Sequence, residues 1–340
     1  MEFKRYDPCG PHFLRVGRHD PAEKECCLWW SGSGVRMEIA CTCLEIEMES
    51  PCTTHAPWIG VLMDGAPVCR FPLGQGVRRY VALAGIDADV KHEVTIIRDT
   101  QTGYDESSAV KLLGIYADGE PAASPVRPLR LEFVGDSLTV GEGCLGPESA
   151  EEWRMIWISH MPAFPTLVSE ALHAEKDVVA LGGWGAARSW DNDKESRIGR
   201  IYDQLCGVIP GGEGAYHGME ADAVVINLGT NDGSALNNLP ENEKPILEKE
   251  MEDRATELME KVRARHPHAL ILWAYGLCGH QVEPILQKAV KRRQAAGDTR
   301  VQYLSLTQAA GNGSRMHPSR AAHRKAAEEI GAALRTALKL

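Results

Sequence analysis

The first third of the chain has apolar residues at alternate positions in short runs, which is the pattern of half-buried β-strands. One run spans residues 35–43, and a second, over residues 44–48, continues it in the opposite phase. Because a shift of one residue turns the side chains to the other face, this change of phase predicts a bulge or a corner between strands. Asp64-Gly65 is a hairpin signal after the next apolar run. We expect an all-β sandwich of jelly-roll type, with further strands at residues 58–63, 80–83, 94–97 and 112–116.

The pattern changes after residues 118–128, a stretch rich in proline and small residues that suits a linker. Beyond it, continuous apolar runs alternate with stretches of helical spacing, as is typical of parallel strands covered by helices on both faces. The runs are residues 129–134, 178–181, 223–228, 269–275 and 301–306. We therefore predict an accessory β-sandwich domain over residues 1–125, followed by a three-layer α/β/α domain with a parallel sheet over residues 126–340.

Charge and composition narrow the class of partner. The 340 residues carry a formal net charge of -10 and Lys and Arg form no runs, so we expect neither nucleic acid nor a membrane surface as a partner. The longest apolar stretches fall short of the roughly 18 residues that a spanning helix needs. The start of the chain resembles no secretory signal, which predicts a cytoplasmic protein. The sequence leaves the oligomeric state open.

Several residues with reactive or aromatic side chains are expected to be structural. The ten cysteines are expected to be reduced, and Cys26-Cys27 and Cys41-x-Cys43 lack the paired spacing of a zinc site, which favours structural thiols over metal ligands. Trp29 and Trp30 are expected in the core of the sandwich rather than as a glycan platform. His323 is expected on the surface of the last helix.

Three segments with reactive side chains follow predicted parallel strands, at the carboxyl ends where open α/β sheets bind ligands. Ser137 lies in the turn after the first strand, Asn231 follows the third, and His317 precedes the final helix. A serine in such a turn acts as a nucleophile when a histidine takes its proton, and an asparagine can donate to the oxyanion that forms. Each segment alone fits an ordinary turn, helix N-cap or surface histidine, so the signal is their combination.

That combination resembles the SGNH, or GDSL-type, hydrolase superfamily. The matching blocks are GDSL at residues 135–138, a glycine block LGGWG at residues 181–185, GTND at residues 229–232 and HPS at residues 317–319. The resemblance covers the C-terminal two-thirds of the chain. It implies a serine esterase or acyl hydrolase without a metal or organic cofactor, with Ser137 as nucleophile and His317 as general base and acid.

The resemblance also implies roles for the residues around the nucleophile. It implies an oxyanion hole made by the backbone N–H groups of Ser137 and Gly183 and by the Asn231 side chain, with Gly185 as the alternative within the glycine block. Asp136 and Trp184 are assigned to the substrate side of the site. We expect Asp136 to brace the loop through hydrogen bonds to the backbone. Trp184 is expected either to stack on a sugar ring or to pack under the loop.

One position departs from the superfamily pattern. The superfamily has Asp three residues before the histidine, and this chain has Ser314 there. Because a neutral hydroxyl cannot stabilise an imidazolium as a carboxylate does, we expect a Ser-His dyad in which another acceptor, such as a backbone carbonyl, holds His317. Loss of the carboxylate leaves an inactive carbohydrate-binding protein as an alternative.

A β-sandwich ahead of an SGNH domain is similar in layout to carbohydrate esterase family two. Residues 16–19, residues 30–34 and the Asp64-Gly65 turn fit that likeness. Some members of that family use a dyad in which a main-chain carbonyl replaces the acid. The likeness implies removal of O-acetyl groups from plant-derived carbohydrates, such as acetylated xylo- or manno-oligosaccharides. An SGNH lipase or thioesterase acting on other acyl esters is the alternative.

Overall fold

The computed structural model describes residues 3–309 and 312–340. The chain divides into two compact units. The first comprises Met1–Pro128 and the later segment Gln204–Gly218, and the second comprises Leu129–Asp203 and Met219–Leu340. No helix in the part of the chain that the structure describes is long and apolar enough to cross a membrane.

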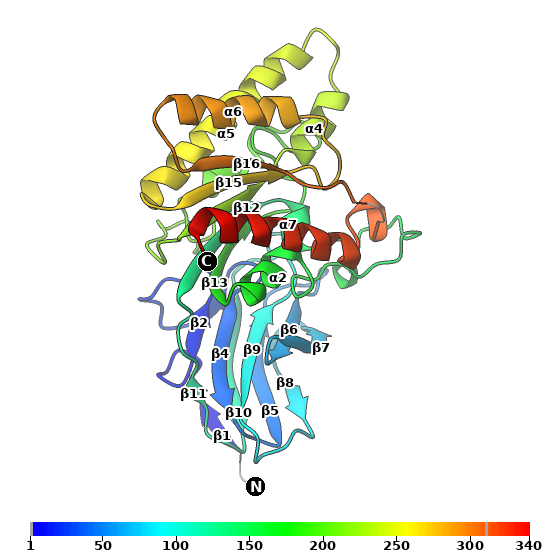
Figure 1. Cartoon of the computed structure of the whole chain (residues 1–340). Coiled ribbons are helices and arrows are strands. Elements are labelled where there is room, and N and C mark those ends of the chain that lie inside the picture. Colours follow the sequence, from blue (N-terminus) through cyan, green and yellow to red (C-terminus); the bar gives the residue numbers. More distant parts are fainter. Residues whose placement is uncertain (1–2, 310–311) are drawn as a thin grey trace. The chain divides into compact units, whose positions relative to one another are not determined.

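The first unit contains two antiparallel sheets, which Figure 1 shows in blue and cyan. One sheet has the order β1 (Lys4–Tyr6), β10 (Val110–Ala117), β5 (Cys43–Ser50) and β8 (Gly76–Ala84), with β3 (Cys26–Leu28) also paired to β10. The other has the order β11 (Ala122–Ala123), β4 (Gly34–Ile39), β9 (His92–Arg98), β6 (Trp58–Met63) and β7 (Ala66–Pro72), with β2 (Leu14–Val16) paired to β4. This arrangement confirms the predicted β-sandwich.

The change of phase in the sequence marks a corner between the sheets. β4 belongs to one sheet and β5 to the other, so residues 40–42 carry the chain across the sandwich. Each strand turns its own alternate side chains inward, which requires the shift by one position. Asp64 and Gly65 form the predicted hairpin turn between β6 and β7.

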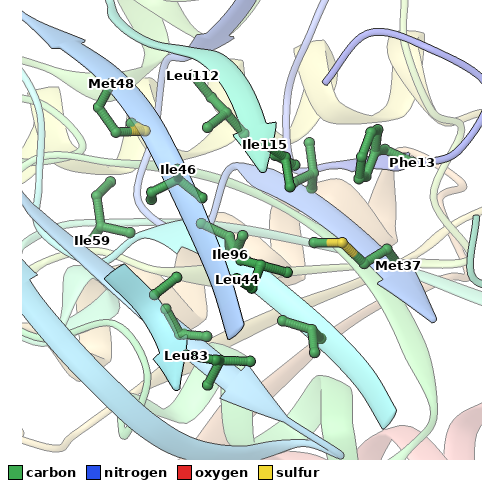
Figure 2. Packing of buried hydrophobic residues seen from close by; sticks show 14 of the residues in the cluster. Phe13, Met37, Leu44, Ile46, Met48, Ile59, Leu83, Ile96, Leu112 and Ile115 are labelled. Carbon is green, nitrogen blue, oxygen red and sulfur yellow. The ribbon is translucent and has the colours of Figure 1, made fainter. Parts of the chain in front are cut away.

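The core of the sandwich is built from the inward-facing side chains of both sheets. Figure 2 shows Ile46 and Met48 from β5 and Leu112 from β10 near Ile59 and Ile96 of the opposite sheet. All five are buried. The burial pattern along β5 alternates strictly, because its outer face carries glutamates.

Segment Gln204–Gly218 packs within the first unit although it lies between elements of the second. Trp30 Nε1 donates to the carbonyl oxygen of Leu205 at 2.7 Å, and Arg18 Nη1 donates to that of Gln204 at 2.6 Å. Trp29 and Trp30 are both buried, which confirms them as core residues rather than a surface platform. The apolar pattern does not predict the placement of this segment, because hydrogen bonds from side chains far away in the sequence hold its backbone.

The second unit has a five-stranded parallel sheet, as predicted. Its order is β13 (Ala174–Ala180), β12 (Leu129–Gly135), β14 (Ala223–Asn227), β15 (Leu270–Tyr275) and β16 (Val301–Ser305). The chain leaves β12 for the neighbour on one side and later returns to the other side at β14. Ligands in such sheets bind at the carboxyl ends of the strands beside this switch point.

Helices cover both faces of the sheet (Figure 1). α2 (Phe164–Ala171) and α7 (Arg320–Leu338) pack together on one face, and α5 (Lys244–Arg265) and α6 (Glu283–Ala295) pack together on the other. The shorter elements are α1 (Ser137–Val140), α3 (Ile198–Ile201), α4 (Thr230–Asn237) and the 3-10 turns η1 (Met155–Trp157) and η2 (Ser314–Met316). The three-layer α/β/α architecture is confirmed.

The expectation for His323 is wrong, because this residue is fully buried. Its position three residues before Ala326 and seven before Ile330 places it on the apolar face of α7. Its ring stacks on Phe164, and its Nδ1 accepts the Phe164 N–H at 3.4 Å. The helical spacing that identified the buried face of α7 therefore included His323.

Candidate active site

Ser137 stands at the start of α1, directly after the carboxyl end of β12. Asp136 is the N-cap of this helix, and its Oδ1 accepts the Leu138 N–H at 3.0 Å. An extended Asp followed by a helical turn makes the chain bend sharply at the serine. The bend holds the Ser137 side chain at the end of the sheet.

His317 and Ser137 lie within hydrogen-bond distance. The Ser137 Oγ and His317 Nε2 atoms are 2.9 Å apart, although 180 positions separate the two residues. The other ring nitrogen, Nδ1, lies 3.0 Å from the backbone carbonyl oxygen of Arg315. If Nδ1 carries the proton and donates it to this carbonyl, Nε2 is left unprotonated and can accept the Ser137 proton.

The position of the superfamily Asp is occupied by a residue with a different task. Ser314 is buried, and its backbone carbonyl accepts the His317 N–H at 3.1 Å. It therefore helps to shape the turn, while the acceptor for Nδ1 is the carbonyl of the next residue, Arg315.

Asn231 connects the third motif to the first two. It lies in the first turn of α4, after β14, and its Nδ2 donates to the Trp184 carbonyl at 2.8 Å. The same nitrogen is 3.3 Å from Asp136 Oδ2. The structure thus brings the nucleophile turn, the glycine block and the Asn231 segment together, with one amide at their junction.

Asp136 is inside the loop rather than on its surface. It is fully buried, and both carboxylate oxygens accept hydrogen bonds, from Leu138 N–H and Asn231 Nδ2. Burial raises the pKa of Asp136 to about 8, and the nearby carboxylate of Asp232 adds to the rise. These contacts fit the expected bracing of the loop and leave the carboxyl no exposure to a substrate.

Asp232 is a structural residue of the site to which the sequence assigned no role. Its carboxylate accepts three backbone N–H groups, from Ala186 at 2.8 Å, Ala187 at 2.7 Å and Arg188 at 3.0 Å. Burial raises the pKa of this carboxyl too. Asp232 therefore fixes the loop after the glycine block to α4. The sequence signal that could have identified Asp232 is its place as the last residue of the GTND block.

Within the glycine block, Gly183 and Gly185 differ in how their backbones are used. Gly183 has φ +84°, which favours glycine, and its carbonyl accepts the Trp190 N–H at 3.1 Å. The N–H of Gly185 instead donates to the Ser196 carbonyl at 3.4 Å, inside the loop. The Gly185 N–H is therefore already used within its own loop.

Trp190 is a further aromatic residue beside Gly183 that the sequence did not single out. A Cβ placed on Gly183 would meet Trp190 Cδ1 at 3.1 Å, so the indole lies directly over that backbone. The Trp190 residue is 57% exposed, whereas Trp184 is half-buried. A large exposed aromatic residue at the carboxyl edge of the sheet is a stronger candidate for sugar stacking than Trp184.

Two chemical features of the described residues bear on cofactors. Among residues 3–309 and 312–340, no group of three or more His, Cys, Asp or Glu side chains could hold a metal ion. The ten cysteines are free thiols. Ser137, His317 and Asn231 carry a hydroxyl, an imidazole and an amide.

Comparison with known proteins gives two family matches. Residues 133–335 match the GDSL-like lipase/acylhydrolase family, and residues 15–125 match the carbohydrate esterase 2 N-terminal family. The first match contains the Ser137, Asn231 and His317 motifs. The second covers most of the β-sandwich.

Similar proteins share the layout of the whole chain. An acetylxylan esterase/glucomannan deacetylase of Cellvibrio japonicus is 25% identical over 331 residues, which are 96% of this chain and 88% of the relative. An acetyl xylan esterase from Butyrivibrio proteoclasticus has a similar structure, with a TM-score of 0.94 and 24% identity over 99% of both chains. A family two carbohydrate esterase from Clostridium thermocellum, in complex with cellohexaose, has a TM-score of 0.83 and 23% identity over 96% of this chain and 99% of its own. The two structural likenesses concern the fold.

Proposed function

The chain belongs to the GDSL-like lipase/acylhydrolase family, which makes it a carboxylic ester hydrolase, and we propose that it removes O-acetyl groups from plant-derived carbohydrates with a Ser137–His317 dyad. The observation that carries the proposal is the 2.9 Å separation of Ser137 Oγ and His317 Nε2, with Nδ1 held by a carbonyl. This arrangement is the one that a histidine needs to take a serine proton.

In the first half of the proposed reaction, Ser137 Oγ attacks the acetyl carbonyl carbon and its proton moves to His317 Nε2. The carbonyl oxygen becomes an oxyanion in a tetrahedral intermediate. The bond from the carbonyl carbon to the sugar oxygen then breaks, and His317 returns the proton to that oxygen. An acetyl group remains on Ser137.

In the second half, water attacks the acetyl carbon while His317 Nε2 takes one of its protons. Collapse of the second tetrahedral intermediate releases acetate, and Oγ recovers its proton. Every proton is transferred through Nε2. The carbonyl of Arg315 keeps the ring in the required tautomer throughout.

The oxyanion is proposed to be held by three donors. These are the backbone N–H groups of Ser137 and Gly183 and the side-chain amide of Asn231. The Asn231 amide makes its shorter hydrogen bond, 2.8 Å, to the Trp184 carbonyl. Its longer contact, 3.3 Å to Asp136 Oδ2, is the one that an oxyanion can replace. Asp136 competes only weakly with the oxyanion for the Asn231 amide near neutral pH, because burial raises its pKa to about 8 and keeps it largely protonated.

Acetylated xylo- or manno-oligosaccharides are the proposed substrates. The relative from Cellvibrio japonicus is named as an acetylxylan esterase and glucomannan deacetylase, and it aligns with almost the whole chain. Trp190, exposed over Gly183, offers a flat apolar face to a sugar ring next to the nucleophile. We further propose a cytoplasmic location, since ten free thiols are usual in a reducing compartment.

A series of chromogenic esters from acetate to octanoate tests the reaction class. We expect kcat/KM to be greatest for acetate and to fall with each longer acyl chain. A rise towards octanoate would contradict acetyl specificity and favour a lipase or thioesterase. No turnover of any ester would favour a carbohydrate-binding protein without activity. Turnover that is lost in a chelator would contradict the proposed metal-free mechanism.

A further inference from the structure

We propose that Glu142 is a positioning residue of the dyad, which anchors Arg315 and supplies the negative charge that the superfamily Asp provides elsewhere. The inference rests on the proposed function in one respect, namely that His317 is the base. Glu142 lies outside the four sequence motifs. Glu142 lies five residues after Ser137, and its backbone N–H donates to the Ser137 carbonyl at 2.9 Å.

The Glu142 carboxylate is buried beside Arg315 and His317. Its side chain is 8% exposed, and its Oε1 accepts from Arg315 Nη1 at 2.9 Å. The same oxygen is 3.8 Å from His317 Nε2. One carboxylate oxygen therefore contacts the residue whose carbonyl holds the imidazole and also faces the ring itself.

The backbone at Arg315 needs such an anchor. Arg315 has φ +54° and Met316 has φ +58°, so two consecutive residues other than glycine adopt the left-handed conformation. That conformation is disfavoured and persists only where the surroundings hold it. The Met316 side chain is 82% exposed and provides little packing. Arg315 is held by its ion pair with Glu142 and by the hydrogen bond from its N–H to the Ala150 carbonyl at 3.0 Å.

The residue after Glu142 lets the two loops lie in direct contact. A Cβ on Gly143 would meet the Ser314 carbonyl oxygen at 2.5 Å and His317 Cβ at 2.7 Å. The Gly143 carbonyl accepts the Ser314 N–H at 3.0 Å. Because the backbone at Gly143 is pressed against the histidine loop, Glu142 is fixed relative to Arg315 rather than reaching it by a flexible path.

The charges around His317 leave Glu142 with an electrostatic role. Glu142 Oε1 lies 3.8 Å from the ring, and the Arg315 guanidinium pairs with that same oxygen. His323, on α7, is near enough to His317 for their charges to interact, but it is neutral near pH 7, because burial lowers its pKa to about 4. Asp136 lies close to Glu142 and is largely protonated below its raised pKa of about 8. A carboxylate 3.8 Å from Nε2 stabilises the imidazolium that forms during each proton transfer.

The test compares Glu142→Gln, Arg315→Gln and their double variant on a chromogenic acetate ester. We expect each single variant to lose about tenfold in kcat with little change in KM, and the double variant to lose no more than the worse single one, since the two residues act as a unit. Additive losses, or kcat within about twofold of the native value in Glu142→Gln, would overturn the inference.

A pH profile separates positioning from mere stability. Removing the carboxylate takes away a negative charge beside the imidazole, so the acid limb of kcat/KM should move to lower pH in Glu142→Gln. Removing the guanidinium should move it to higher pH in Arg315→Gln. Asp298→Asn is the matched control, because Asp298 is 9% exposed and pairs with Arg263 at 2.9 Å away from the motif loops. It should reduce stability and leave the acid limb in place. An unmoved acid limb in both Glu142→Gln and Arg315→Gln contradicts the proposal.

Histidine-labelled NMR makes the test independent of turnover. The His317 signal is assigned by its loss in His317→Asn, and its Nδ1–H proton should show a weaker hydrogen bond in Glu142→Gln than in the native chain, because the Arg315 carbonyl is no longer anchored. An identical Nδ1–H signal in the two chains overturns the inference even if the enzyme is active. Conversely, a weakened Nδ1 hydrogen bond in Glu142→Gln, together with a native chain that releases no acetate, would leave the positioning role in place and defeat the proposed function. If Arg315→Gln is partly unfolded, Arg315→Lys takes its place in the test. Arg315→Lys keeps the charge and should retain more activity than Arg315→Gln.

Discussion

The Nδ1 atom of His317 lies 3.0 Å from the carbonyl oxygen of Arg315, where serine hydrolases with a triad have a carboxylate. A carbonyl can fix the tautomer and orientation of the ring, because it accepts one hydrogen bond in one direction. It carries only a partial negative charge, so it stabilises the imidazolium less than a carboxylate does. The proposed role of Glu142 follows from this difference, since the carbonyl orients the ring and a carboxylate has to supply the charge.

Asn231→Ala tests the oxyanion hole. We expect kcat to fall by about a hundredfold or more while KM changes little, because the lost donor acts on the charge that develops in the transition state. Steady-state kinetics on an acetate ester measure this. Asn237→Ala, at the other end of α4, is the matched control and should stay within about twofold of the native rate. Equal effects of the two variants would exclude Asn231 from the oxyanion hole.

Asp136→Asn tests the buried carboxyl through the pH dependence of stability. A pKa raised to about 8 means that the folded chain keeps a proton that the unfolded chain releases above about pH 4. The contribution of Asp136 to stability is therefore present at low pH and is lost as the pH rises towards 8. Urea unfolding of the native chain and the variant should show their difference in unfolding free energy decreasing by about 4 kcal/mol from pH 5 to pH 8. A constant difference would mean that Asp136 is ionised in the folded chain.

His323→Gln should show a pH dependence of the opposite sign. Burial lowers the pKa of His323 to about 4, so protonation of the unfolded chain destabilises the fold as the pH falls through about 6.5. A glutamine can accept the Phe164 N–H but does not titrate. We expect the variant to lose about 2 kcal/mol less stability than the native chain between about pH 7 and about pH 4.5. Parallel acid unfolding curves would contradict the buried neutral histidine.

Trp190→Ala tests sugar stacking. We expect kcat/KM for an acetylated xylo-oligosaccharide to fall by about tenfold, mainly through KM, and to fall much less for a small chromogenic acetate. Trp190→Phe, which keeps an aromatic face, should recover most of the loss. Equal losses on both substrates would assign Trp190 to the shape of the Gly183 loop instead.

The elements and the motifs of this chain were predictable from local patterns. The corner between β4 and β5 follows from a change of phase, and the placement of Ser137 and Asn231 follows from the carboxyl ends of β12 and β14. The position of the segment Gln204–Gly218 was not predictable, since it depends on contacts with residues such as Trp30, 175 positions away in sequence.

The partner of His317 was predictable only as a class. A backbone acceptor depends on φ and ψ at Arg315, and the letter R does not encode a left-handed conformation. The burial of Glu142 was not predictable either. A glutamate after a nucleophile turn is usually solvated, and only the fold shows its contact with Arg315. His323 differs from both, since its spacing from Ala326 and Ile330 already placed it on the buried face of α7.

The most direct measurement is the rate of acetate release from an acetylated xylo-oligosaccharide by the native chain and by Ser137→Ala. We expect the native chain to release acetate and the variant, with an unchanged unfolding midpoint, to be slower by about a thousandfold or more. Acetate release by the folded Ser137→Ala variant at the native rate would contradict the serine dyad on which the account depends.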